Sequence, residues 1–467
     1  MKKPFVIEKL TVEKVSPEEK SLARHEGKVI FIDNTVPGDV VDVRVFKSKK
    51  SFGLGTAIHF HSLSPIRQTP PCAHFTLCGG CQWQDIQYSH QLEFKRNIVK
   101  EAFEHVGKVQ SLPEILPTVG AEETLYYRNK LNYGFSDKSI VYDESFNNKM
   151  RYVSEPGAGF HVPKDFERIL DIEHCHLQAE PSNAIRNFIK AFLIENEISI
   201  HNVRRHEGWF RDMVVRMTTK GHLMLVIAYY FEDENGAKLM DALLKAFPQI
   251  DSLYYVINHK MNDFTGDLDF HLYHGIPQIQ EELGHLTFNI SPKSFFQTNS
   301  KQAKTLYDIT KEYAGLTGTE RVYDLYTGTG SIALYVADQA KEVFGIEYVE
   351  AAIEDAKENA KLNNISNCSF FAGDMAKELN EAFILKHGQP DVIIADPPRA
   401  GMHGDVIEML LKIAAPKIVY VSCNPVTQAR DLQLLDKAYR VVKIQPVDMF
   451  PHTKHVENIA LLELNKS

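Results

Sequence analysis

Apolar and polar residues alternate in short runs over the first 67 positions of the chain. The alternation predicts strands over residues 5–9, 27–32 and 39–46, and Pro37-Gly38 marks a turn before the last of them. Short strands at this spacing favour a small β-barrel of the OB type, a fold that often binds oligonucleotides. This end of the chain is therefore a candidate nucleic-acid-binding module.

From about residue 286 the pattern changes to a regular alternation of apolar strands and amphipathic helices. Strands are predicted over residues 321–326, 342–347, 368–374, 391–396, 417–423 and 459–464, with helices over 332–339 and 349–362. This alternation predicts a doubly wound, mostly parallel α/β sheet of the Rossmann-like kind. Ligands of such sheets bind at the carboxyl ends of the strands.

The region between these two patterns is less regular. Residues 89–106 have helical spacing with Ser89 as the expected N-cap, and residues 213–217 and 223–228 have the composition of core strands. A chain of 467 residues corresponds to roughly three domains. The prediction is an OB-like domain over 1–67, a central α+β domain over 68–284, and an α/β domain over 285–467.

Composition narrows the class of protein. Apolar residues make up 44% and charged residues 24%, which excludes a disordered chain or a small disulfide scaffold. The longest apolar run, residues 223–231, is far shorter than the ~18 residues of a membrane span, and the N-terminus lacks a signal-peptide core. We expect a soluble, cytoplasmic protein with no membrane partner.

Charge is unevenly distributed along the chain. The net charge is −9, but residues 1–67 hold 12 basic and 8 acidic residues and are therefore positive. Lys47, Lys49 and Lys50 lie between Phe46 and Phe52, and a basic run with aromatic residues suits single-stranded nucleic acid. An ordinary solvated hairpin would have the same composition, so this segment alone does not decide between the two.

Glycines and acids follow the first three strands of the predicted α/β sheet. Asp324 precedes Gly328 and Gly330, Glu347 closes the second strand, and Asp374 closes the third. The turn is neither G-x-G-x-x-G nor a phosphate-binding loop with lysine, which weakens dinucleotide and triphosphate interpretations. Acids in register with a glycine turn suit an adenosine whose ribose hydroxyls and adenine edge need acceptors.

The six cysteines are also unevenly placed. Cys72, Cys78 and Cys81 fall within ten residues, and Cys175 stands apart. Such a set can bind zinc or an iron–sulfur cluster, although zinc sites usually pair two C-x-x-C units. Four unrelated thiols are the alternative. Cys423 lies next to Asn-Pro after a predicted strand, whereas Cys368 is expected to be an ordinary core residue.

The motifs together resemble a class I S-adenosylmethionine-dependent methyltransferase. Within that class they resemble the RNA (uracil-5-)-methyltransferase family, and most of all its bacterial 23S ribosomal RNA type. The motifs that carry the resemblance are Phe295-Phe-Gln297-Thr-Asn299, Asp396-Pro-Pro-Arg399, Ser422-Cys423-Asn424-Pro425 and Asp448-Met-Phe-Pro-His-Thr-Lys-His455-Val-Glu457. It spans the whole chain, because residues 1–67 also resemble a TRAM domain.

The resemblance implies a role for each motif. C5 of uracil is a poor nucleophile, and attack of a thiolate at C6 makes it reactive enough to take a methyl group. Cys423 is then the nucleophile, Glu457 the base that removes the C5 proton, and Asp396 a contact to the uracil edge or to the nucleophile. S-adenosylmethionine would be bound by Gln297, Asp324, Tyr326, Gly328, Gly330, Glu347, Asp374 and Asp396.

The resemblance further implies a [4Fe-4S] cluster on Cys72, Cys78, Cys81 and Cys175, with a structural or RNA-orienting role because methyl transfer needs no electrons. The partner would be 23S ribosomal RNA, in which a single-stranded or loop uridine is flipped toward a monomeric enzyme.

Three alternatives stay open. A tRNA uridine is a second target, although the better-known bacterial tRNA enzymes lack the N-terminal module and the cysteine cluster. An enzyme that modifies two ribosomal sites is another. A catalytically silent RNA-binding assembly factor is the third, and intact Cys423 and Glu457 count against it. Adenine amino-methyltransferases also carry Asp-Pro-Pro, but usually with an aromatic residue where this chain has Arg399.

Overall fold

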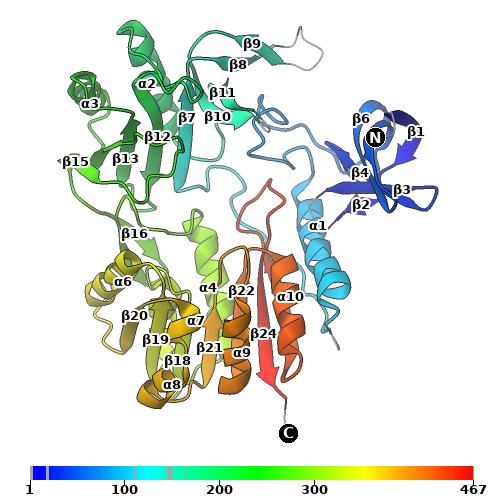
Figure 1. The fold of residues 1–467 in the computed structure, drawn as a ribbon, viewed down its shortest axis with the longest axis vertical. Coiled ribbons are helices and arrows are strands. Elements are labelled where there is room, and N and C mark those ends of the chain that lie inside the picture. Colours follow the sequence, from blue (N-terminus) through cyan, green and yellow to red (C-terminus); the bar gives the residue numbers. More distant parts are fainter. Residues whose placement is uncertain are drawn as a thin grey trace.

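The computed structural model describes residues 4–16, 20–109, 112–143, 145, 150–162 and 165–465. Figure 1 shows an N-terminal barrel set apart at one side, a central sheet, and a C-terminal α/β domain. Along the described residues, no helix combines the length and the apolar character that a membrane span requires.

The N-terminal domain is a six-stranded sheet in the order β1-β5-β6-β4-β3-β2. Its strands are β1 Phe5–Thr11, β2 Lys14–Val15, β3 Ser21–His25, β4 Lys28–Asp33, β5 Val40–Ser48 and β6 Phe52–Ser62. The three strands predicted from sequence are confirmed as β1, β4 and β5. Strand β6 escaped prediction because its two glycines and two histidines interrupt the apolar alternation.

The central sheet has nine strands in the order β15-β14-β13-β12-β7-β10-β11-β8-β9. Its elements are β7 Lys130–Ser136, β8 Ser139–Tyr142, β9 Met150–Val153, β10 Gly157–Val162, β11 Asp165–Asp171, β12 Phe210–Met217, β13 Leu223–Tyr229, β14 Ser252–Ile257, β15 Phe270–Gly275, and the helices α2 Ser182–Glu195 and α3 Asn235–Ala246. Both helices pack on one face. Val226 and Tyr254 point from the other face into the core of the C-terminal domain.

The C-terminal domain has a seven-stranded sheet in the order β20-β19-β18-β21-β22-β24-β23. Its strands are β18 Arg321–Leu325, β19 Glu342–Glu347, β20 Cys368–Ala372, β21 Val392–Ala395, β22 Lys417–Ser422, β23 Tyr439–Val447 and β24 Glu457–Leu464. Strand β24 runs antiparallel to β22 and β23, and the other pairs are parallel. The predicted doubly wound, mostly parallel sheet is therefore confirmed.

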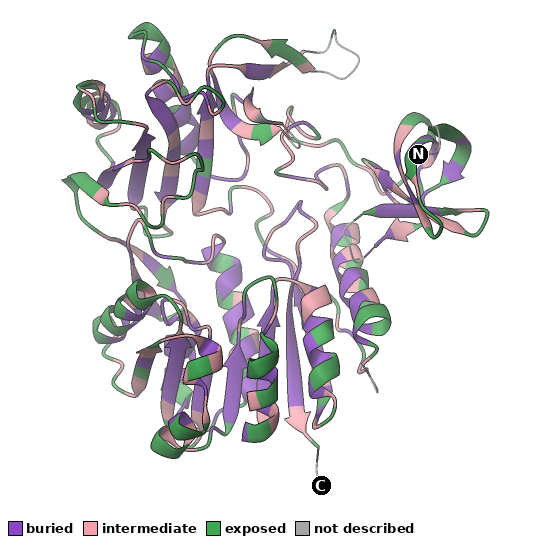
Figure 2. Ribbon diagram, in the orientation of Figure 1, coloured by how far each residue is buried: buried purple, intermediate pink, exposed green. Residues whose placement is uncertain are grey.

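Helices cover both faces of this sheet, and Figure 2 shows its strands buried between them. They are α4 Ser300–Ala314, α5 Ser331–Val336, α6 Glu350–Leu362, α7 Met375–Glu378, α8 Glu381–His387, α9 Gly404–Ile413 and α10 Pro425–Leu435, with a short 3₁₀ turn η2 Ala337–Gln339 after α5.

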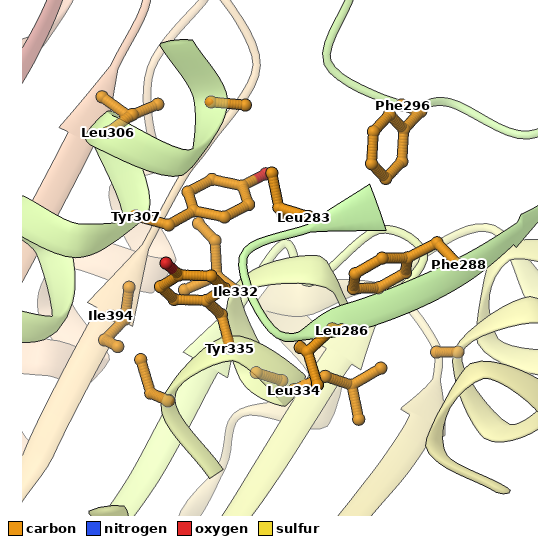
Figure 3. Packing of buried hydrophobic residues seen from close by; sticks show 14 of the residues in the cluster. Leu283, Leu286, Phe288, Phe296, Leu306, Tyr307, Ile332, Leu334, Tyr335 and Ile394 are labelled. Atoms are coloured by element: carbon orange, nitrogen blue, oxygen red, sulfur yellow. The ribbon is translucent and has the colours of Figure 1, made fainter. Parts of the chain in front are cut away.

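Two segments outside residues 285–467 belong to the C-terminal unit. Strands β16 Ile279–Leu283 and β17 Leu286–Ile290 form a hairpin, so the boundary expected at residues 284 and 285 falls in its turn. Figure 3 shows Leu283 and Leu286 of this hairpin beside Tyr307 and Tyr335. The physical boundary lies before the hairpin.

The second segment is helix α1 Tyr88–Glu101, which continues into the π-helix η1 Ala102–Gly107. Its apolar side chains share a core with the C-terminal sheet rather than with the central one. The chain then follows the edge of that sheet, where Ile115 bridges to Ile444 and Val119 to Val447. The expected N-cap, Ser89, is wrong: Ser89 lies inside the helix, and its N-cap is Gln87.

Candidate active site

Asp324 is the penultimate residue of strand β18 and organises the turn that follows. Its Oδ2 atom accepts hydrogen bonds from the Thr327 hydroxyl (2.5 Å) and the Ala333 amide (3.0 Å). Its Oδ1 atom is buried and has no hydrogen-bond partner among the described residues. Burial raises the pKa of Asp324 to about 7, more than these two hydrogen bonds lower it. One buried acceptor is therefore left available to a ligand.

The glycine turn brings backbone rather than side chains to this edge of the sheet. Gly328 and Gly330 have φ of 55° and 78°, and Tyr326 between strand and turn has 64°. A Cβ atom on Gly330 would lie 2.9 Å from Cβ of Ala356, whereas one on Gly328 would have no neighbour within 4 Å. Gly330 is therefore required by packing, and Gly328 leaves the backbone open to an approaching molecule.

Glu347 and Asp374 extend the same edge. Glu347 ends β19, and its two oxygens accept from the amides of Gly328 (3.1 Å) and Val349 (3.0 Å). Asp374 lies two residues beyond β20 and caps α7, accepting from the Ala376 amide (3.1 Å). Strands β18, β19 and β20 are neighbours, so the sheet brings the three predicted acids to one edge.

The other half of the same edge carries Asp396, Cys423 and Glu457. Asp396 directly follows β21, Cys423 directly follows β22, and Glu457 is the first residue of β24. These three strands are adjacent in the sheet. Ser422 pairs with Asn458 in the antiparallel register of β22 and β24, which puts Cys423 opposite Glu457. Residues from three distant sequence motifs thus meet at one place.

This group of side chains has strongly perturbed acidity. Burial, reinforced by Asp396, raises the pKa of Glu457 to about 8, and Arg399 and Lys95 oppose the shift. Burial together with Asp324 raises the pKa of Asp396 to about 7. Carboxyl groups that gain and lose protons near neutrality are typical of sites that transfer protons.

Cys423 is half-buried, and its pKa rises to about 12. Burial is the largest cause, followed by the charges of Glu457 and Asp396, and Arg399 acts in the opposite direction. Because the two acids raise the thiol pKa only when ionised, protonation of either one favours the thiolate. The nucleophilicity of Cys423 is therefore coupled to the state of the two carboxyls.

Asn424 and Pro425 explain why Cys423 lies in a turn. Asn424 caps α10 by accepting from the Val426 amide (3.1 Å), and Pro425 occupies the first helical turn. The Asn424 side chain also donates from Nδ2 to the carbonyl of Arg399 (3.0 Å). The cysteine turn and the Asp-Pro-Pro-Arg loop are thus held together, and the Arg399 guanidinium contacts His455 Nδ1 at 3.1 Å.

Gln297 lies in a segment that joins the central and C-terminal domains. Asn129, next to β7, donates from Nδ2 to the Gln297 carbonyl (2.8 Å) and to the Ser300 hydroxyl (2.8 Å). Asn299 caps α4 and donates to the Met449 carbonyl (3.0 Å). This segment is consequently fixed from both sides of the domain junction.

Two buried residues of this region were missed by sequence reasoning. Tyr307 on α4 bonds the Ser331 hydroxyl (2.9 Å), and its pKa is raised by burial and by Asp396, Asp324 and Glu457. The charge of Lys95 on α1 lowers the pKa of Glu457. A signal for Lys95 was present: Gln91 and Lys95 occupy the same helical stripe as Ile98 and Val99, where apolar residues are expected.

The four clustered cysteines meet around a separate cavity of about 140 Å³, lined also by Arg128 and His176. Burial and the neighbouring thiols raise the pKa of Cys81 to about 12. Within the described ranges, no group of three or more His, Cys, Asp or Glu side chains is placed to hold a metal ion. The fold therefore assembles the predicted thiols, but a metal or cluster there stays a prediction.

Comparisons with known proteins place these features in context. Residues 278–465 match the family model described as tRNA (Uracil-5-)-methyltransferase, and residues 6–58 match the TRAM domain. The chain is 48% identical over 454 residues to an uncharacterized RNA methyltransferase of Bacteroides thetaiotaomicron, covering 96% of this chain and all of that one. It is 49% identical to one of Porphyromonas gingivalis, covering 97% of this chain and 98% of that one.

A solved structure is similar along nearly the whole chain. It is the Pyrococcus abyssi tRNA (uracil-54, C5)-methyltransferase in complex with S-adenosyl-L-homocysteine, with a TM-score of 0.75 and 29% identity. The match covers 97% of this chain and 100% of that chain. The similarity thus extends over the N-terminal barrel, the central sheet and the C-terminal sheet.

Proposed function

The chain belongs to the RNA (uracil-5-)-methyltransferase family, and from this premise we propose that it methylates C5 of a uridine in 23S ribosomal RNA. The observation that carries the chemistry is the meeting of Cys423, Asp396 and Glu457 at one edge of the sheet, two of them with pKa values near neutrality. A half-buried thiol beside such carboxyls suits covalent catalysis with proton transfer.

S-adenosylmethionine supplies an electrophilic methyl group when it is bound. The first half of the edge fits its adenosine part, because Asp324 has an unpartnered buried oxygen and Gly328 leaves the backbone open. The residues that would hold it are Gln297, Asp324, Tyr326, Gly328, Gly330, Glu347, Asp374 and Asp396.

The second half of the edge would activate the uracil. The Cys423 thiolate would add to C6, and the electrons of the C5=C6 bond would move toward C5, which would take the methyl group as S-adenosylhomocysteine leaves. Ionised Glu457 then accepts the C5 proton, the C6–S bond breaks, and the C5=C6 double bond and the thiolate are restored. Asp396 is placed to bond the uracil edge or to position the nucleophile.

The N-terminal domain supports an RNA substrate. Lys49 lies over the ring of Phe52, with 5.4 Å from Nζ to the ring centroid, on the segment predicted to contact nucleic acid. Such a module can hold folded RNA while one base is unstacked into the active site. A cytoplasmic location accords with this substrate.

A tRNA uridine is the second candidate, and one observation favours it. The solved tRNA enzyme from Pyrococcus abyssi aligns with 97% of the chain, including the N-terminal barrel. That alignment removes the N-terminal module as an argument against a tRNA target. The ribosomal target rests on the resemblance of the sequence motifs.

The cysteine cavity supports a proposal of its own, a [4Fe-4S] cluster on Cys72, Cys78, Cys81 and Cys175 with a structural or RNA-orienting role. The four thiols line one cavity of about 140 Å³, and four cysteine thiolates are the usual ligands of such a cluster. When bound, the cluster would supply the positive charge that four buried thiolates need.

The target is tested by incubating the protein with labelled S-adenosylmethionine and transcripts of large-subunit ribosomal RNA and of tRNA, followed by mapping of the label. We expect 5-methyluridine at one ribosomal position. Label in tRNA alone would replace the ribosomal target with the second candidate, and two ribosomal positions would identify a dual-site enzyme. Label on adenine or cytosine, or no transfer at all, would contradict the proposed chemistry.

A further inference from the structure

The loop between β23 and β24, residues 448–456, leads directly into Glu457. Residues of helix α1, which precede the C-terminal domain in the sequence, hold this loop. Its first residue, Asp448, forms an ion pair with Lys95 of α1 (Nζ to Oδ1, 2.5 Å), and both side chains have no exposed surface. Lys95 also donates to the Phe450 carbonyl (3.1 Å), and the Tyr88 hydroxyl donates to Asp448 Oδ2 (3.0 Å).

The middle of the loop is held by a second set of bonds. The Gln91 side chain accepts from the His452 amide (3.0 Å) and contacts His452 Nδ1 (3.1 Å). The amides of Gln82 and Trp83, which directly follow Cys81, both donate to the His452 carbonyl (2.8 and 3.0 Å). Residues 82–95 therefore hold both the start and the middle of the loop, while Asn299 and Tyr127 donate to the carbonyls of Met449 and Pro451.

A fully buried ion pair is a poor source of stability, because removing two charges from water costs about as much as their attraction returns. The presence of such a pair is better explained by the loop that it holds in place. Lys95 is close enough to Glu457 to lower its pKa. The charges of Asp396 and Arg399 also shift the pKa of Glu457. The charge of Glu457 in turn raises the pKa of Cys423 and of Tyr307.

We propose that Lys95 is a positioning residue for Glu457: through Asp448 it fixes the loop that carries the base, and its charge favours the ionised form of the carboxylate. The inference rests on the proposed function, in which Glu457 must be ionised to accept the C5 proton. Loss of Lys95 would therefore slow the release of methylated RNA from Cys423 more than the formation of the adduct.

The test compares Lys95→Met with Lys100→Met, since Lys100 lies on the same helix with an exposed side chain. Adduct formation and product release are followed in single turnovers, on the transcript that the wild-type enzyme methylates. We expect Lys95→Met to slow release by about tenfold or more and to accumulate the protein–RNA adduct. Its release rate should also depend on pH with a midpoint higher than in the wild type, because the cation that favours the ionised carboxylate is lost. Lys100→Met should behave as the wild type.

Lys95→Met leaves the Asp448 carboxylate buried without its cation, which can prevent folding. The double variant Lys95→Met/Asp448→Asn removes both charges and decides the question in that case. In the double variant, slow release with accumulation of the adduct supports the proposal. Release at the wild-type rate, or an equal loss of adduct formation and release in a folded variant, would overturn it.

A measurement without RNA separates this inference from the proposed function. The Glu457 carboxyl can be titrated by NMR in carbon-13-labelled protein and assigned by the signal that Glu457→Gln removes. A higher pKa in Lys95→Met than in the wild type supports the role of the Lys95 charge even if the wild-type protein methylates neither transcript. An unchanged pKa would refute it even if the enzyme is active.

Discussion

Cys423 and Cys81 lie in two regions that raise the pKa of a thiol to a similar value. The two regions place different groups around the thiol. Burial is the main reason that both thiols have a pKa raised to about 12. Near Cys423 the further charges are those of Glu457, Asp396 and Arg399. Near Cys81 they are those of other thiols, Cys78, Cys175 and Cys72.

The difference in neighbours matches the two proposed roles, a reactive thiol at Cys423 and a cluster ligand at Cys81. The carboxyls near Cys423 can be neutralised by single protons, so its thiolate can form and disappear during a reaction cycle. The thiols near Cys81 repel one another's charge, and four thiolates in a cavity require a bound cation. The contrast teaches that a raised thiol pKa indicates a function only when the groups that cause it are known.

The sharpest test of this contrast replaces the proposed nucleophile. Cys423→Ala should lower methyl transfer by about 10⁴-fold or more, because the covalent adduct that activates C5 cannot form without the thiol. Transfer is measured with labelled S-adenosylmethionine, and circular dichroism checks the fold. A Cys423→Ala enzyme with wild-type activity would place the chemistry elsewhere.

The next largest effect is expected at Glu457. Glu457→Gln should form the adduct but release product about 10²- to 10⁴-fold more slowly, since the base that accepts the C5 proton is lost. Denaturing gel electrophoresis of protein with labelled RNA detects the trapped species. Normal release together with normal transfer would exclude Glu457 as the base.

The cysteine cavity should respond to a different measurement. Protein purified without oxygen should be coloured and carry about four iron ions and four sulfides per chain. Cys78→Ser should lose most of the iron, whereas Cys423→Ser should keep it, because Cys78 lines the cavity and Cys423 does not. Zinc in place of iron, or iron loss in Cys423→Ser, would break the distinction between the two thiol regions.

The smallest effect concerns stability as a function of pH. The pKa of Glu457 is about 8 in the folded protein and 4.5 as its ordinary value. Its carboxyl therefore stabilises the fold at low pH, and this contribution is lost as the pH rises through about 8. Between about pH 5 and pH 9 the unfolding free energy of the wild type should fall by about 2 kcal/mol more than that of Glu457→Gln. Urea titrations measure the difference, and parallel pH curves would contradict the buried, protonated carboxyl.

Much of the C-terminal domain was predictable because local pattern and tertiary role agree there. The strand predicted over 342–347 is β19 itself, and each acid expected at a strand end lies at the same edge of the sheet. Strand β23 escaped prediction because it is an edge strand with exposed positions and a proline. Ser89 failed as an N-cap because tertiary packing, not local capping, sets where α1 begins.

By itself, the sequence determined the class of the C-terminal sheet, three of the six N-terminal strands and the motifs that place Cys423, Asp396 and Glu457 at strand ends. These follow from periodicity and turn residues, which are local properties of the chain. Only the tertiary structure decided that α1 and its buried Lys95 serve the C-terminal domain, and that Cys175 joins three distant cysteines at one cavity. Contacts across such separations depend on how whole elements pack, and packing leaves no fixed spacing in the sequence.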